Sequence, residues 1–90
     1  MIVRYSPGLL SQLKKVNVRI RKRFKERIVI FIKDPFNPHL NNHILRDEWE
    51  GYRSIELTND WRAIYEELKE GEDTIGYFVA VGTHKDLYGS

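Results

Sequence analysis

The stretch Tyr52–Val81, YRSIELTNDWRAIYEELKEGEDTIGYFVAV, contains three segments with the composition of β-strands, separated by two turns. Residues 52–57 alternate between two faces, which is typical of a strand that is buried on one side. The turns are predicted at Thr58-Asn59-Asp60 and Gly71-Glu72-Asp73, because these residue types favour changes of direction. This stretch therefore predicts an antiparallel sheet, and it decides the fold class.

The two later segments of this stretch predict a return strand and a central strand. Residues 61–68 form the return strand, and residues 74–81 are almost wholly apolar, as expected for a strand that is buried on both faces. A hairpin centred on Asn59 places Glu56 opposite Arg62. We expect these two side chains to lie together on one face of the sheet.

The first 40 residues have helical periodicity. Residues 2–5 are β-rich and predict a first strand, and two helices are predicted over residues 7–16 and 18–33, separated by Asn17. The Ser6-Pro7 pair is typical of a helix N-terminus. The predicted inward stripe of the first helix consists of Leu9, Leu10, Leu13 and Val16. The stripe of the second helix consists of Ile20, Phe24, Ile28 and Phe31, joined near its end by Ile32.

The order of these elements predicts an α+β fold. We expect an N-terminal strand and a helical hairpin packed on one face of a mostly antiparallel, four- to five-stranded sheet. Residues 43–46 are either a further short strand or a loop. A chain of 90 residues has room for one core, so residues 1–90 are predicted to form one domain.

The composition is that of a globular protein, with 41% hydrophobic and 31% charged residues and no cysteine. Disulfides and thiolate chemistry are therefore excluded. The longest apolar run, residues 28–32, is far too short for a membrane span. The N-terminus lacks the apolar core of a signal peptide, so the sequence predicts a soluble, cytoplasmic protein that does not bind a membrane.

Charge is divided unequally along the chain. Residues 1–46 carry eleven Lys/Arg and two Asp/Glu, a net +9, whereas residues 47–90 carry four Lys/Arg and eleven Asp/Glu, a net −7. This asymmetry indicates either a polyanionic partner or two halves that attract each other in the fold.

Cofactor signatures are not found in this sequence. The glycine-rich phosphate-binding motifs and the HExxH zinc motif are missing. His39 and His43 are four residues apart, but the prolines around them argue against a helix that would unite them at a metal. We therefore expect neither a metal nor another cofactor.

Three motifs in the second half of the chain carry a resemblance to a known family. They are Trp49-Glu50-Gly51-Tyr52-Arg53, Asp60-Trp61-Arg62-Ala63-Ile64-Tyr65 and Gly82-Thr83-His84-Lys85-Asp86-Leu87-Tyr88-Gly89. In this order they resemble the RelE/ParE toxin superfamily, and most of all its YafQ-type mRNA interferase branch. The resemblance implies a RelE-like fold and a toxin of a type II toxin–antitoxin system. It also implies metal-independent cleavage of mRNA in the ribosome, by attack of the 2′-hydroxyl on the adjacent phosphate.

The resemblance implies roles for five residues, each of which has a plainer alternative. His84 would be the general acid, or else a polar residue of the C-terminal tail. Asp60 would accept a proton or orient the group that does, or would only shape its turn. His43 would aid catalysis, or would make a loop hydrogen bond. Arg62 would bind phosphate, or would pair with Glu56. Glu56 stands where some relatives have a histidine, and it would act as a base or only pair with Arg62.

Further residues are predicted to contact RNA. Arg53 is a second candidate for phosphate binding, and Trp61 and Tyr88 match aromatic positions that border the site in relatives, with core packing as the alternative. Lys85 adds a charge beside His84. The basic second helix is predicted to grip the ribosomal RNA backbone, unless its charges serve only solvation: Arg19, Arg21, Lys22, Arg23, Lys25 and Arg27.

The partners implied by the resemblance are a cognate antitoxin, mRNA and the ribosome. Two other functions stay open at this point. ParE-type members share the fold but inhibit DNA gyrase without catalysis, and an inactive relative would retain only antitoxin or RNA binding. The set His43, Asp60 and His84 favours the nuclease, because a gyrase inhibitor has no need of it.

Overall fold

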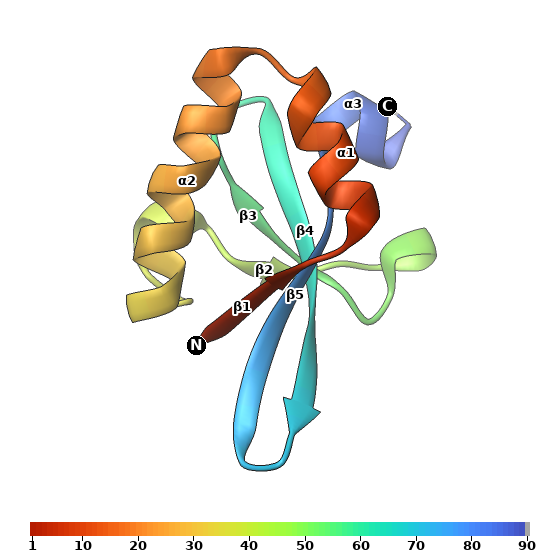
Figure 1. Ribbon diagram of the computed structural model, residues 1–90. Coiled ribbons are helices and arrows are strands. Elements are labelled where there is room, and N and C mark those ends of the chain that lie inside the picture. The colour runs from red at the N-terminus through yellow and green to blue at the C-terminus, as the bar shows by residue number, and fades with distance from the viewer. Residues whose placement is uncertain (90) are drawn as a thin grey trace.

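The computed structural model describes residues 1–89, and five strands form one mixed sheet in the order β1-β5-β4-β3-β2 (Figure 1). β1 runs parallel to β5, and the other neighbouring pairs are antiparallel. The strands are β1 (Ile2–Tyr5), β2 (His43–Ile44), β3 (Arg53–Glu56), β4 (Trp61–Glu70) and β5 (Asp73–Thr83). The predicted α+β class and the mostly antiparallel sheet are confirmed.

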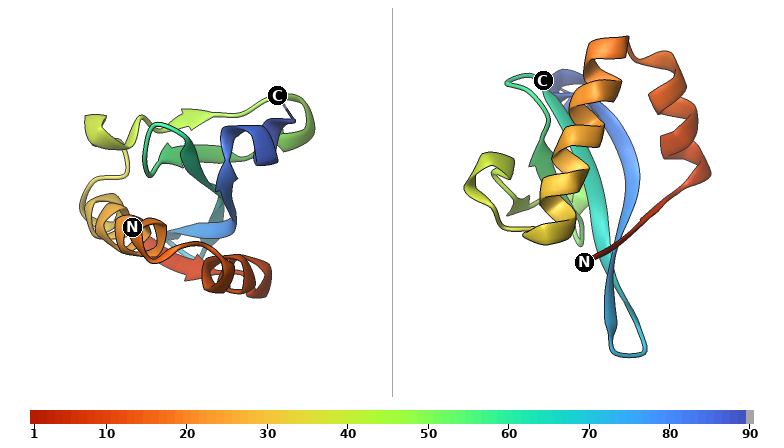
Figure 2. Two further views of the ribbon diagram at one scale, coloured as in Figure 1. Left: turned by 90° about the horizontal axis from the view of Figure 1, so that it is seen from above. Right: turned by 60° about the vertical axis from the view of Figure 1, so that its left-hand side comes forward.

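Two helices cover one face of the sheet, and a short terminal helix lies on the other side (Figure 2). The covering helices are α1 (Pro7–Lys15) and α2 (Val18–Lys33), close to their predicted bounds. The short helix α3 (His84–Tyr88) follows β5 on the opposite side, where the sequence prediction had only a terminal segment. Single 3-10 turns occur at η1 (Pro38–Leu40) and η2 (Asp47–Trp49). In residues 1–89 no helix is long and apolar enough to cross a bilayer.

Side-chain caps define where the covering helices begin. The Ser6 hydroxyl accepts a hydrogen bond from the Leu9 backbone N–H at 3.0 Å, which confirms the predicted start of α1. The Asn17 side-chain oxygen accepts from the Ile20 N–H at 3.0 Å and so begins α2. One asparagine therefore separates the two helices and caps the second.

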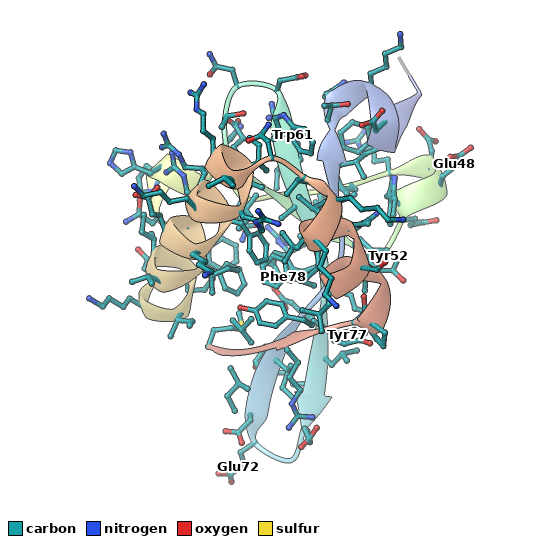
Figure 3. All side chains as sticks on the ribbon, turned by 45° about the horizontal axis from the view of Figure 1, so that its top comes forward. Glu48, Tyr52, Trp61, Glu72, Tyr77 and Phe78 are labelled. Carbon is teal, nitrogen blue, oxygen red and sulfur yellow. The ribbon has the colours of Figure 1, made fainter. Side chains whose placement is uncertain are left out.

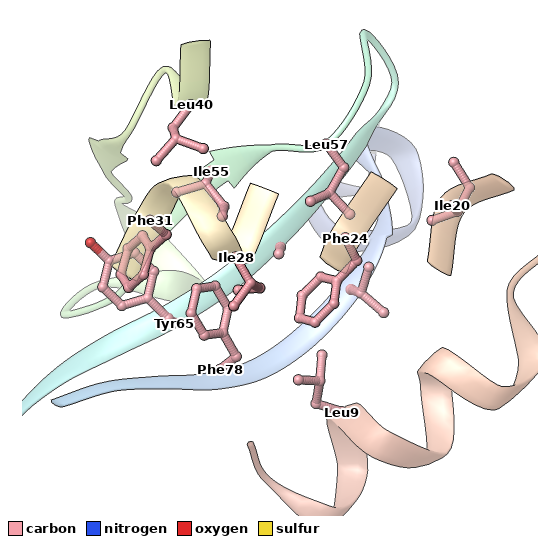
Figure 4. Close-up of a cluster of buried hydrophobic side chains, with 12 residues drawn as sticks. Leu9, Ile20, Phe24, Ile28, Phe31, Leu40, Ile55, Leu57, Tyr65 and Phe78 are labelled. Atoms are coloured by element: carbon pink, nitrogen blue, oxygen red, sulfur yellow. The ribbon is translucent and has the colours of Figure 1, made fainter. Parts of the chain in front are cut away.

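The core lies between α1, α2 and the sheet (Figure 4). The Phe31 ring packs edge-on against the rings of Tyr65 and Phe78, with centroids 4.8 and 5.2 Å away. Gly76 makes this contact possible, because a Cβ there would lie 2.8 Å from Phe31 Cε2. The remaining buried members of the cluster are Leu9, Ile20, Phe24, Ile28, Leu40, Ile55, Leu57, Ala63 and Val81.

Two residues of the predicted inward stripes are instead exposed. Leu10 and Ile32 have 46% and 45% of their surface accessible. Each lies about 100° around its helix from a fully buried neighbour, Leu9 or Phe31, that occupies the contact with the sheet. The sheet therefore covers a narrower stripe of each helix than the apolar pattern predicts.

The long β4–β5 hairpin extends beyond the other strands, with Glu72 at its tip and far from Trp61 (Figure 3). The tip is charged and exposed over residues 67–73. Within this tip, Glu70 makes a bidentate ion pair with Arg4 of β1, with N–O distances of 3.0 and 3.1 Å. Both side chains are more than half exposed, so this pair contributes about 1 kcal/mol or less to stability.

Candidate active site

The face of the sheet opposite α1 and α2 carries the predicted pair from the first hairpin. Glu56 lies opposite Arg62, as the turn at residues 58–60 predicts, and Arg62 lies opposite Gly82 of β5. The alternating neighbours Ile55, Ala63 and Val81 are all in the helix-covered core. Because side chains alternate along a strand, Glu56 and Arg62 belong to the other face.

Helix α3 lies over the β5 end of this second face, and a glycine makes room for it. A Cβ on Gly82 would lie 3.2 Å from Leu87 Cγ and 3.4 Å from Asp86 Cβ. A reciprocal cap begins the helix: the Thr83 hydroxyl accepts from the Asp86 N–H at 3.0 Å, and the Asp86 carboxylate accepts from the Thr83 N–H at 3.4 Å. The Thr-x-x-Asp spacing at residues 83–86 is the sequence signal from which this helix could have been predicted.

This arrangement connects His84 with Asp60. His84 is the first residue of α3, and its backbone N–H donates to the Asp60 carbonyl at 2.9 Å. The Thr58 hydroxyl shapes the same turn, since it accepts from the N–H groups of Asp60 and Trp61 at 3.3 and 3.1 Å. The contact between His84 and Asp60 thus runs through the backbone, and both residues are exposed to solvent.

The His84 ring packs edge-on against the Tyr88 ring one turn later, with a centroid distance of 4.6 Å. Tyr88 is half-buried, and its hydroxyl oxygen is buried without a hydrogen-bond partner among residues 1–89. Trp49 of η2 donates from Nε1 to the Leu87 carbonyl at 2.9 Å and packs against Tyr52. Trp49 therefore links η2 to α3.

Arg62 is held by carbonyl groups at the β3–β4 turn. Its Nη1 donates to the Thr58 carbonyl at 2.8 Å and to the Trp61 carbonyl at 3.1 Å. The ion pair with Glu56 that offered an alternative role does not form in residues 1–89, although the two residues face each other. Glu56 instead accepts a hydrogen bond from the Asn41 side-chain amide. The Arg62 guanidinium therefore has no carboxylate partner within residues 1–89.

His43 lies on the same face, at the β2 edge of the sheet. It is paired with Ser54, which stands two residues before Glu56 and so points to the same side. The His43 Nδ1 is 2.8 Å from the Asn41 carbonyl oxygen. A carbonyl only accepts, so Nδ1 carries the proton, and in the neutral ring Nε2 is an acceptor. Asn41, in the left-handed conformation with φ 45°, thus contacts both His43 and Glu56.

Two predicted RNA contacts point to the core face instead. Arg53 is the first residue of β3, donates from Nε to Asn42 Oδ1 at 2.8 Å and lies 5.1 Å from the Phe36 ring centre. Trp61 is half-buried and packs against the core cluster. Asn42 also donates to the Tyr65 hydroxyl at 2.8 Å. Burial raises the pKa of the Tyr65 phenol, and this hydrogen bond and Arg53 oppose the shift.

The cations of α2 lie on the helix side of the molecule and differ in their contacts. Arg21 donates to the carbonyls of Leu13 and Lys14 at the end of α1, at 3.4 and 3.3 Å. Arg27 donates to the His39 carbonyl at 3.2 Å. Arg23 lies 3.7 Å from a Glu26 oxygen. The remaining cations of the helix, which are exposed, are Arg19, Lys22, Lys25 and Lys33.

The structure therefore places the five predicted catalytic residues in two groups on one face. Asp60, Arg62 and His84 meet at the β4–α3 end, and Glu56 and His43 meet through Asn41 at the β2–β3 end. Asn41 and Thr58 were not predicted as site residues, because an asparagine and a threonine in loops carry no distinctive signal. Within residues 1–89 no group of three or more His, Asp or Glu side chains is arranged to hold a metal ion.

A mixed five-stranded sheet with an N-terminal strand and a helical hairpin on one face matches the fold of RelE-like toxins. The structure superposes with a TM-score of 0.77 on YafQ from E. coli strain BL21(DE3), at 26% identity over 97% of both chains. It also superposes on the YoeB/ParE toxin from Agrobacterium tumefaciens with a TM-score of 0.73, at 16% identity over 93% of this chain and 99% of that one. A search of curated proteins found no match.

The particular family follows from the sequence match. The model of the family described as bacterial toxin of type II toxin-antitoxin system, YafQ, matches residues 9–89. The chain belongs to this family, and it is a toxin of a type II toxin–antitoxin system.

Proposed function

We propose that this toxin is an endoribonuclease that cuts mRNA bound to the ribosome in the cytoplasm. The observation that carries the proposal is the polar face opposite α1 and α2. It combines a histidine anchored to the Asp60 turn, a half-buried arginine without a carboxylate partner in residues 1–89, and a second histidine with a defined tautomer. Membership of the YafQ family supports the same activity.

The reaction needs three kinds of group. The 2′-hydroxyl attacks the adjacent phosphorus and loses its proton to a base, a 2′,3′-cyclic phosphate forms, and the 5′-oxygen leaves with a proton from an acid. A cation stabilises the charge that develops on the phosphoryl oxygens. Both proton transfers require groups that exchange protons near neutral pH, which histidine does.

We assign the acid to His84 and the phosphoryl contact to Arg62. His84 is exposed at the start of a capped helix, so its ring stands at a defined place beside Tyr88. Arg62 lies on the strand that leads away from the Asp60 turn, and its charged fork suits phosphate oxygens. Tyr88 offers a ring for stacking on a base, and Lys85 adds a positive charge on the same helix.

We assign the proton acceptor to the Nε2 of His43, because the Asn41 carbonyl holds the proton on Nδ1. Glu56 accompanies it, oriented by the Asn41 amide. Asp60 acts through its backbone carbonyl, which positions His84. A larger loss of cleavage in Asp60→Asn than in His43→Ala would move the base to the Asp60 carboxylate.

The cognate antitoxin is the proposed protein partner. A solved structure with a TM-score of 0.62, at 27% identity over 97% of both chains, is the E. coli DinJ–YafQ complex. A toxin–antitoxin complex from Mycobacterium tuberculosis, RelBE2, shares the fold with a TM-score of 0.58, at 20% identity over 92% of this chain and 96% of that one. Mutual recognition of toxin and antitoxin is expected for this chain as well.

The decisive experiment is single-turnover cleavage of mRNA on purified ribosomes. We expect His84→Ala to slow cleavage about 100- to 10,000-fold, because the leaving oxygen then lacks its proton donor. Its free energy of unfolding is expected to stay within about 0.5 kcal/mol of the wild type, since His84 is exposed. Glu72→Ala, at the hairpin tip, is the control and should cleave like the wild type.

Two results would contradict the proposal. Wild-type toxin that leaves ribosome-bound mRNA intact but inhibits DNA gyrase would favour the ParE-like function. Wild-type toxin that neither cleaves mRNA nor slows growth would identify an inactive relative.

A further inference from the structure

A groove separates α2 from the β3–β4 turn. It consists of two adjoining hollows of about 250 and 320 Å³, which share Arg19, Arg23 and Thr58. We call it the α2 groove and define it by Arg19, Arg23, Arg27, His39, Thr58 and Trp61. Lys22 and Lys25 are on the same helix but do not line it.

The cationic wall of the α2 groove is regular. Arg19, Arg23 and Arg27 are spaced four residues apart, so they lie along one side of α2 at intervals of about 6 Å. Such a row can meet successive phosphates of an extended strand, and each guanidinium can bind phosphate oxygens as a fork. Arg27 is braced by the His39 carbonyl at 3.2 Å, whereas Arg19 and Arg23 are exposed.

The groove borders the candidate active site. Glu56 and Thr58 line it. Glu56 is also the cross-strand neighbour of Arg62 in the β3–β4 hairpin, so it borders both the groove and the candidate active site. The Thr58 carbonyl also holds the Arg62 guanidinium at 2.8 Å. A chain bound at Arg62 can therefore pass over the β3–β4 turn directly into the groove.

The lining suits RNA better than an acidic peptide. The half-buried Trp61 contributes to one end, where its ring offers a surface for a base. The arginine row suits the evenly spaced charges of a phosphate backbone, and the direct route to Arg62 suits a strand that is cut there. A carboxylate, Glu56, marks the junction between the two sites.

We propose that the α2 groove binds the substrate RNA strand itself, through the phosphates that flank the cleavage position. This inference rests on the proposed endoribonuclease function. It differs from a general attraction between a basic helix and ribosomal RNA, because only the arginines that line the groove take part.

The test is ribosome-free binding of a labelled single-stranded RNA oligonucleotide whose 2′-hydroxyls are methylated, measured by fluorescence anisotropy. We compare Arg19→Gln/Arg23→Gln with Lys22→Gln/Lys25→Gln, which remove the same charge from the same helix. The groove variant is expected to bind about tenfold more weakly and to show a salt dependence reduced by about two phosphate contacts. The lysine variant is expected to bind within about twofold of the wild type. Thermal unfolding verifies that both variants are folded.

Two outcomes would overturn the inference. An equal loss in both variants would mean a diffuse field around α2, without a binding groove. Unchanged RNA binding in the groove variant, together with weakened antitoxin binding, would mean that the groove receives an acidic protein segment.

Cleavage on ribosomes, measured in parallel, separates this inference from the proposed function. If the wild type does not cleave mRNA but the groove variant still loses RNA affinity, the nuclease function is refuted and the groove is supported as an RNA-binding site. If the wild type cleaves mRNA and the Arg19/Arg23 variant binds RNA as tightly as the wild type, the nuclease function is supported and the RNA-binding groove is refuted.

Discussion

The two faces of the sheet are closed in different ways. On the helix side, Leu9 of α1, Phe31 of α2 and Phe78 of β5 are fully buried, and the Phe31 and Phe78 rings are in contact. On the α3 side, one short helix and η2 lie over the sheet, joined by hydrogen bonds such as that from Trp49 to Leu87. Apolar burial holds the first face, whereas caps and single hydrogen bonds position the second. We therefore expect substitutions on the helix side to change mainly the stability and substitutions on the α3 side to change mainly the proposed cleavage activity.

The largest expected effect is on the helix side. Phe31→Ala should lower the free energy of unfolding by about 3–5 kcal/mol, because it removes a fully buried ring that contacts Tyr65 and Phe78. Ile32→Ala, one residue later and 45% exposed, should lose about 1 kcal/mol or less. Urea denaturation measures both. Equal losses would show that the sheet covers the wider stripe that the sequence predicts.

A smaller effect is expected where α3 meets the sheet. Gly82→Val should push against Leu87, cost about 1–3 kcal/mol of unfolding free energy and displace His84 from its place. The rate of mRNA cleavage on ribosomes should fall by a larger factor than the fraction of folded protein. Adding Leu87→Ala removes the side chain that the introduced valine would strike and should recover part of the cleavage rate. If the double variant is no better than the single one, Gly82 is not what positions α3.

The smallest effect is expected at Asn41. Asn41→Gly keeps the positive φ and the carbonyl that accepts from His43, but it removes the amide that donates to Glu56. Cleavage should fall several-fold, corresponding to roughly 1 kcal/mol for one hydrogen bond to a carboxylate. An unchanged rate would remove Glu56 from the reaction.

Local patterns account for the elements that were predicted well. The α2 stripe of Ile20, Phe24, Ile28 and Phe31 is buried, and the turn at residues 58–60 sets the Glu56–Arg62 register. Both depend on neighbours within a few residues. The exposed Leu10 and Ile32 depend on how much of a helix the sheet covers, which no local pattern contains.

The candidate site was proposed from motifs more than from physical patterns. The resemblance points to His84, Asp60 and Arg62, and the structure holds His84 and Arg62 on backbone carbonyls of the 58–61 turn that the motifs do not reveal. Arg53 lies at the start of β3, where its guanidinium reaches Asn42. The parallel pairing of β1 with β5 and the helix at residues 84–88 were not predicted.

By itself, the sequence determined the two covering helices and the strands of the two hairpins, because periodicity, caps and turn residues act over a few positions. It also determined which reactive side chains are available. Only the tertiary structure decided which face each of them occupies. Arg62 and Trp61 are neighbours in sequence yet serve opposite faces, and the α2 cations divide between a groove and open solvent. These outcomes depend on contacts between segments far apart in the chain.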